Sequence, residues 1–206
     1  MGMIGTRVMR TEDPDLVTGR GTFVDNLALP GATHVVYVRS TIAHGRMLSI
    51  DADEARTMPG VVGVFTADDL SADGIGPVPI DMPLLPADIA RGALASDTVR
   101  FVGELVAAVV AESRAQAVDA AERVQVEYEP LPVVVDAEEA MTSSTLLFPD
   151  RGSNVVVTLP AQREVDFSAC EVIVERRILN RRIAPSPLEP RVAASRWEEP
   201  DENGVR

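Results

Sequence analysis

The residue types in this chain that most often carry chemistry are two histidines and some adjacent carboxylates. No cysteine or carboxylate spacing around His34 or His44 has the form of a metal site, so we interpret both as packed or solvated side chains. The adjacent carboxylates form two pairs, Asp68-Asp69 and Glu138-Glu139. Acid–base chemistry needs two groups that face one substrate, whereas sequence neighbours point apart. We therefore predict helix caps or solvated charges at both pairs.

A nucleophile and a phosphate-binding loop also have weak support. The single cysteine, Cys170, lies between REVDFSA and the largely apolar EVIV, which predicts a buried structural thiol rather than a nucleophile. The segment TGRGTF places Gly19 and Gly21 in a Gly-x-Gly pattern. It lacks the third glycine and the preceding strand of a dinucleotide-binding fingerprint. We interpret these glycines as turn residues.

Two arginine clusters, ERR and NRR, follow the cysteine. They contain Arg176, Arg177, Arg181 and Arg182. Guanidinium groups bind anions through two parallel hydrogen bonds, so an anion site is one interpretation. The alternative, which we favour, is an arginine-lined strand edge or a subunit contact. The residues themselves assign no catalytic, cofactor-binding or metal-binding position anywhere in the chain.

Composition indicates an ordinary globular chain with a strong acidic excess. The 206 residues are 46% hydrophobic and 25% charged, which suits one large or two small domains with a real core. A net charge of −13 disfavours nucleic acid and anionic membrane surfaces as partners. The lone cysteine excludes an internal disulfide, and no apolar run has the length of a membrane span or signal peptide. We expect a cytoplasmic location.

The elements that would position these residues are clearest between residues 105 and 130. The apolar run 105–111 predicts a buried strand. Ser113 and Gln116 have the spacing of a capping box. Apolar positions then recur at helical spacing, at Ala117, Ala120, Ala121 and Val124. Residues 124–129 alternate apolar and polar, as in a half-buried strand. We interpret this as a strand–helix–strand crossover of an α/β layer, with alternate residues of the first strand packed under the helix.

The flanking regions predict further elements and one change of pattern. Residues 1–33 are turn-rich around a short strand-like segment, TFVD. Residues 33–70 predict strand, strand, a short helix capped by Asp51 or Asp53, strand and the start of a helix. Residues 71–97 predict an ordered surface loop. Beyond a boundary between residues 140 and 155, the segments NVVVTLP, CEVIVERRIL and PRVAASRW predict a β-rich second unit.

The order of several phrases resembles one protein family. The phrases include RTEDPDLVTGRGTFVDN, STIAHGRMLSID, MPGVVGVFTADDL, VRFVGELVAAVV, YEPLP and NRRIAPSPLEPRVAASRW. Over nearly all of residues 5–200 they are similar, in collinear order, to the opening of the large subunit of molybdenum hydroxylases. This is the xanthine dehydrogenase, aldehyde oxidase and carbon monoxide dehydrogenase family. Leu105 stands where a proline is common in that family and Arg181 where a glutamine is common, so the substrate class stays open.

The resemblance implies a fold and a domain order. It implies a mixed α/β fold with an α/β-hammerhead domain at residues 16–140, after an N-terminal extension at 1–15. Residues 141–154 are then a linker, and 155–206 are the incomplete, β-rich start of the molybdopterin-binding domain. The family's full large subunit is several times longer, and its GGGFG loop does not occur here. We therefore expect an N-terminal piece of that subunit, with no catalytic, cofactor-binding or metal residue of its own.

The resemblance also implies an activity and partners for the full assembly. Its members oxidise aldehydes, N-heterocycles or carbon monoxide at a molybdopterin-type molybdenum cofactor, with oxygen taken from water. Electrons leave through iron–sulfur and flavin partner domains or subunits. We expect this chain to contact the rest of the large subunit and those partners, or a second copy in a homodimer, and to be inactive alone. The alternative, from another class, is a stand-alone binding or assembly module without catalysis.

Overall fold

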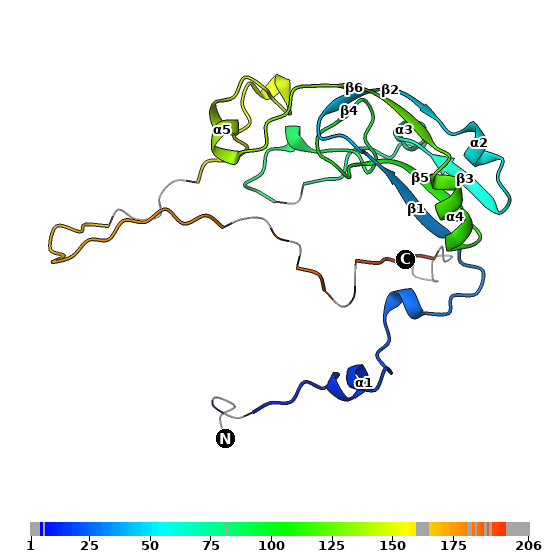
Figure 1. Ribbon diagram of the computed structural model, residues 1–206, viewed down its shortest axis with the longest axis horizontal. Helices are drawn as coiled ribbons and strands as arrows, with labels where there is room; N and C mark the ends of the chain where they lie inside the picture. The colour runs from blue at the N-terminus through cyan, green and yellow to red at the C-terminus, as the bar shows by residue number, and fades with distance from the viewer. Residues whose placement is uncertain are drawn as a thin grey trace, which may run out of the picture. The chain divides into compact units, whose positions relative to one another are not determined.

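The computed structural model describes most of the chain. The described residues are 5, 7–80, 82–159, 165–180, 183, 185–187, 189 and 191–196. The chain divides into two compact units, one of which is Gly31–Val165. The other combines Met1–Pro30 with Asp166–Arg206. Figure 1 traces both units along the chain.

Two three-stranded antiparallel sheets form the framework of the Gly31–Val165 unit (Figure 1). The first sheet has the order β1-β5-β3 and contains β1 (His34–Arg39), β5 (Leu105–Ala111) and β3 (Val61–Phe65). The second has the order β4-β2-β6 and contains β4 (Thr98–Val99), β2 (Gly45–Asp51) and β6 (Gln125–Pro130). The strands predicted between residues 33 and 65, at 105–111 and at 124–129 are confirmed.

Short helices connect these strands. They are α2 (Asp53–Arg56), α3 (Ala67–Ala72), α4 (Arg114–Ala121) and α5 (Ala137–Thr142), with 3₁₀ turns η2 (Ala87–Ile89) and η3 (Pro149–Arg151). The prediction that Asp51 or Asp53 caps α2 is wrong, because the N-cap residue is Ala52, whose side chain cannot accept a hydrogen bond. Asp51 Oδ1 still accepts a hydrogen bond from the Asp53 amide at 3.1 Å. No helix in the described part of the chain has the length and apolar character needed to cross a membrane.

The strand–helix–strand stretch is present, but it is not a crossover within one sheet. Both edges of β5 are occupied by antiparallel neighbours, β1 and β3. Because β5 has no free edge, β6 pairs with β2 in the second sheet, and α4 connects one sheet to the other. Of the two side-chain-to-backbone hydrogen bonds of the predicted capping box, one is present. Ser113 Oγ accepts from the Gln116 amide at 3.4 Å, whereas the Gln116 side chain contacts the Ser113 hydroxyl instead of its backbone amide.

The core of this unit lies where α4 and α2 pack against the first sheet. Its buried cluster contains Ala52, Ala55, Val64, Val109, Ala120 and Val124. The residues of β5 under the helix were predicted to be Val106, Ala108 and Val110 or their alternates. Val109 lies in the buried cluster with Ala120, which selects the alternate set, Ala107, Val109 and Ala111, although Val106 is fully buried as well. Ala117 and Ala120 are also fully buried, and their small side chains allow α4 to approach the sheet closely.

Several predictions outside this framework need correction. The segment TFVD is not a strand, because Val24–Asn26 form a 3₁₀ turn, η1, and the preceding Asp13–Val17 form a short helix, α1. The three segments predicted as strands beyond residue 153 contain no strand among their described residues. A strand needs a neighbour to take its hydrogen bonds, and these extended residues have none in a ladder. Val172, Val174 and Ile178 are accordingly 76%, 71% and 88% exposed.

Candidate functional site

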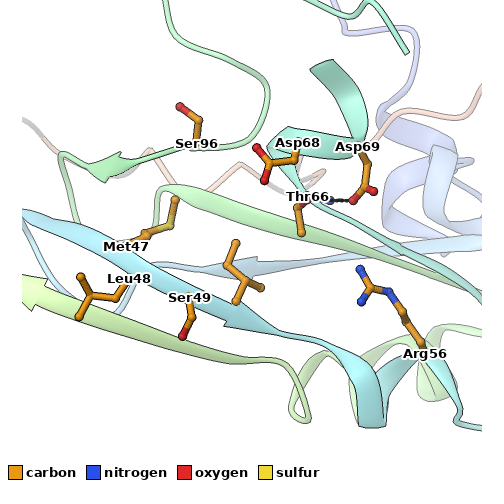
Figure 2. Close-up of a pocket in the computed structure, with 9 residues that line it drawn as sticks. Met47, Leu48, Ser49, Arg56, Thr66, Asp68, Asp69 and Ser96 are labelled. Carbon is orange, nitrogen blue, oxygen red and sulfur yellow. Dashed lines mark hydrogen bonds between the residues drawn. The ribbon is translucent and has the colours of Figure 1, made fainter. Parts of the chain in front are cut away.

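An open hollow of about 370 Å³ lies beside β2, α2 and the start of α3 (Figure 2). The residues that line it include Met47, Ser49, Arg56, Thr66, Asp68 and Asp69. Strand β2 supplies the apolar part, and the ends of α2 and α3 supply a guanidinium and two carboxylates. The hollow therefore brings together the Asp68-Asp69 pair and Arg56.

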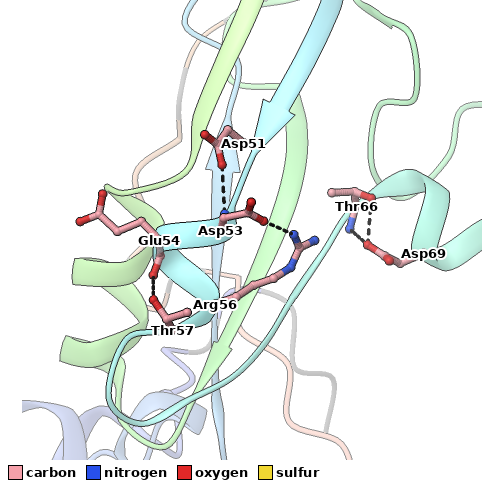
Figure 3. A network of polar contacts seen from close by, with 7 residues as sticks. All are labelled: Asp51, Asp53, Glu54, Arg56, Thr57, Thr66 and Asp69. Atoms are coloured by element: carbon pink, nitrogen blue, oxygen red, sulfur yellow. Dashed lines mark hydrogen bonds and ion pairs between the residues drawn. The ribbon is translucent and has the colours of Figure 1, made fainter.

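Asp69 in this hollow acts as a helix cap (Figures 2 and 3). Its Oδ2 accepts hydrogen bonds from the backbone amide of Thr66 at 2.7 Å and from the Thr66 hydroxyl at 2.9 Å. The hydrogen bond from the Thr66 amide favours the charged carboxylate and lowers the pKa of Asp69 below its usual value. Asp68 is exposed. The pair is thus one cap and one solvated charge, as predicted.

Replacing Asp69 with asparagine is expected to lower the free energy of unfolding at pH 7 by about 0.5–1 kcal/mol, because a neutral amide is a weaker acceptor at a helix start. The folded-state pKa of Asp69 lies below that of the unfolded chain. The contribution of Asp69 to the free energy of unfolding is therefore complete above its unfolded-state pKa of about 3.9. It disappears as the pH falls through the folded-state pKa. Urea unfolding at pH 7 and at successively lower pH should show the two proteins converging in that acid window. Asp68→Asn is the matched control, and equal effects of the two changes would contradict the cap.

A polar network surrounds the short helix α2 (Figure 3). Arg56 pairs with Asp53 at 3.5 Å, and the Thr57 hydroxyl donates to the Glu54 carbonyl at 2.8 Å. Arg123, which follows α4, reaches Glu54 at 3.6 Å. These charges are largely exposed, so each pair contributes little energy. The position of α2 beside α4 follows instead from the apolar cluster that contains Ala55 and Ala120.

Three polar side chains are buried among the described residues of this unit, and one of them is a carboxylate. Ser40, His44 and Glu104 are 3%, 7% and 6% exposed. Glu104 accepts from the backbone amide of Arg100 at 2.5 Å and from Arg91 Nη1 at 3.2 Å. The Ser40 amide donates to the Glu104 carbonyl at 2.8 Å. The carboxylate therefore holds the turn before β5 in place, beside the end of β1.

The buried imidazole of His44, just before β2, is bonded to the backbone just after β6. His44 Nδ1 lies 2.7 Å from the Pro132 carbonyl, which only accepts, so this nitrogen carries the proton. The Leu131 amide donates to the His44 carbonyl at 3.0 Å. Nearby, burial raises the pKa of the Tyr128 phenol, and a hydrogen bond with Ser40 partly opposes that shift. Sequence reasoning missed this cluster. Its residues lie in the segments STIAHG, VGE and YEPLP, of which STIAHG departs from the family's more usual SPHAHA.

The two histidines and Gly19 have the environments predicted for them, whereas Gly21 does not lie in a turn. His34 is exposed at the start of β1, whereas His44 is packed, and the described residues contain no group of His, Cys, Asp and Glu that could hold a metal ion. Gly19 follows α1 with φ of 70°, a turn conformation that favours glycine. Glu138 and Glu139 are exposed in the first turn of α5.

Cys170 is a correction, because its thiol is exposed rather than buried. Its amide donates to the Phe167 carbonyl in a turn, and the apolar residues after it have no sheet to pack into. Arg176 and Arg177 are also exposed, and Arg176 donates to the Glu175 carbonyl at 3.0 Å. The described residues there form no strand, so the strand-edge interpretation is wrong for this pair. Arg181 and Arg182 lie outside the described residues. The subunit-contact and anion-site interpretations stay predictions.

Comparisons with known proteins agree with the resemblance. Residues 18–132 match the family model "aldehyde oxidase and xanthine dehydrogenase, a/b hammerhead domain". The chain is 40% identical to the 6-hydroxypseudooxynicotine dehydrogenase complex subunit gamma of Paenarthrobacter nicotinovorans, over 91% of this chain and 24% of that protein. It is 36% identical to the carbon monoxide dehydrogenase large chain of Afipia carboxidovorans, over 90% of this chain and 24% of that protein.

A solved structure gives the same result in three dimensions. Quinoline 2-oxidoreductase from Pseudomonas putida 86 matches with a TM-score of 0.65 and 41% identity, over 75% of this chain and 20% of that one. The chain spans about a quarter of the length of the curated relatives it matches. The expected mixed α/β-hammerhead fold is confirmed. The chain belongs to the aldehyde oxidase and xanthine dehydrogenase family and contains its α/β-hammerhead domain.

Proposed function

We propose that this chain is the N-terminal structural portion of the large, molybdopterin-binding subunit of a molybdenum hydroxylase. The full assembly would oxidise aldehydes, N-heterocycles or carbon monoxide with oxygen from water. Residues 16–140 form the hammerhead domain in this proposal, and residues 155–206 start the molybdopterin-binding domain. The observation that carries it is similarity over 91% of this chain to only 24% of an oxidoreductase subunit.

The packing of the domain supports a scaffold role. Its buried polar side chains among the described residues, Ser40, His44 and Glu104, all bond to backbone groups of turns or strand ends. The carboxylate with the lowered pKa in the hollow, Asp69, caps α3. These groups are committed to structure, which leaves the chemistry to other parts of the assembly.

In this proposal the molybdopterin-type cofactor lies in the remaining part of the large subunit, and iron–sulfur and flavin groups lie in partner domains or subunits. The partners of this chain are those proteins, in a cytoplasmic assembly.

The purified 206-residue chain is expected to contain no stoichiometric molybdenum and to oxidise no aldehyde, purine or other N-heterocycle. Elemental analysis and dye-linked oxidation assays measure both properties. The reason is that, in this proposal, the molybdopterin-binding and catalytic residues belong to the remaining part of the large subunit. Stoichiometric molybdenum with turnover in the isolated chain would refute the proposal.

A chimera tests the scaffold role directly. Replacing the matching segment of the 6-hydroxypseudooxynicotine dehydrogenase gamma subunit with this chain should give a complex that retains its molybdenum, because the two segments are 40% identical. The control chimera carries Glu104→Ala in the inserted segment, and it should assemble in lower yield. A chimera that folds and assembles but cannot hold molybdenum would contradict the assignment.

A further inference from the structure

Residues 136–156 form a strap at one end of the compact unit. The strap contains α5 and η3 and no strand. Figure 1 shows α5 at the end of the unit opposite to α4. The sequence predicted a linker for most of this stretch, residues 141–154. The strap is instead held in place by a few polar side chains, which replace the backbone ladder that holds the two sheets.

Asn154 closes the strap on itself. Its Nδ2 donates to the carbonyls of Ala140 and Thr145, at 3.0 and 2.8 Å. Its Oδ1 accepts from the Leu147 amide at 3.0 Å. One partly buried amide therefore satisfies three backbone groups that have no ladder to join. Removal of the side chain would leave all three groups without these partners.

Two guanidinium groups attach the strap to the rest of the unit. Arg100, which follows β4, donates to the Leu147 carbonyl at 2.9 Å and lies 4.8 Å from the centre of the Phe148 ring. Arg151, inside the strap, pairs with Asp88 at η2. The Arg151 side chain is 16% exposed, and its Nε is buried without a hydrogen-bond partner among the described residues. An incompletely satisfied buried guanidinium makes this attachment easier to open than a sheet.

We propose that the strap is a releasable device that opens as one cooperative unit, with Asn154 as its latch, while both sheets stay folded. Segments that lack ladder hydrogen bonds and extensive apolar burial open at a lower free energy than the core. Opening uncovers Leu147 and Phe148 and frees the loop at Asp88.

Hydrogen exchange of the full chain, read by mass spectrometry, tests the latch. Asn154→Ala should speed exchange of the amides in residues 137–156 by about tenfold to a hundredfold, because the three hydrogen bonds of the Asn154 side chain are lost. Exchange in β5 and β6 should be unchanged. Asn26→Ala is the matched control, since Asn26 is exposed in η1 in the other compact unit, and it should alter neither region.

A second variant distinguishes one cooperative unit from separate local contacts. Arg151→Gln should speed exchange of the same set of amides, including those of α5. Arg151 bonds to Asp88 and to the carbonyls of Val155 and Val156, none of which belongs to α5. The proposal is overturned if each variant affects only the amides beside its own side chain. It is also overturned if Asn154→Ala removes protection from β5 and β6, because strap and sheets would then unfold together.

Discussion

Replacing Ala120 with arginine is expected to lower the free energy of unfolding by about 2–4 kcal/mol. Ala120 is fully buried on the face of α4 that packs against the first sheet, in the same cluster as Val109 and Ala55. An arginine there must displace these neighbours or carry a charge into an apolar contact. Urea unfolding followed by circular dichroism measures the change.

The matched control lies two residues further along the chain. Glu122 is exposed at the end of α4, so Glu122→Arg exchanges one solvated charge for another and should alter stability by less than about 0.5 kcal/mol. The two changes introduce the same side chain and differ only in burial. Equal losses would mean that the buried face of α4 is assigned wrongly.

The helix face and the strands around it could be predicted because local pattern determines them. The alternation in residues 125–129 and the cap at Ser113 are local properties of the chain, and both occur in the structure. The partner of each strand is not a local property. The sequence predicted β5 and β6 as strands of one layer. In the structure β1 and β3 occupy both edges of β5, and β6 pairs with β2 in the other sheet. The prediction of strands beyond residue 153 is wrong for the same reason, because a strand forms only beside a partner strand that takes its hydrogen bonds.

The buried polar cluster could not be predicted from spacing. Its contacts join residues far apart in sequence, such as His44 with Pro132, and each residue type is common at surfaces as well. Asp69 was predictable as a cap because its partner, Thr66, stands three residues before it. For Ser40 and Glu104 the only available signal was their place inside phrases shared with the family. Membership in such a phrase does not say which contact the residue makes in the folded chain.

Replacing Glu104 with alanine is expected to cost about 2–3 kcal/mol of unfolding free energy. The carboxylate is 6% exposed and accepts from the Arg100 amide and from Arg91. Its removal leaves the amide without this partner and Arg91 without its counter-ion. Arg91 is 46% exposed, so water compensates part of the loss, which keeps the cost below that of a fully buried pair. Glu104→Gln keeps an acceptor for the Arg100 amide and should cost only about 1 kcal/mol.

The control for this change stands just beyond the other end of the same strand. Glu112 follows β5 with an exposed side chain, so Glu112→Ala should alter stability by less than about 0.5 kcal/mol in the same urea titration. The order Glu104→Ala, Glu104→Gln, Glu112→Ala, from largest loss to smallest, is the expected result. If glutamine and alanine at position 104 cost the same, the carboxylate acts through its charge on Arg91, and its bond to the Arg100 amide contributes nothing. If all three variants are as stable as the wild type, Glu104 does not hold the turn before β5, and the scaffold role loses its main buried contact.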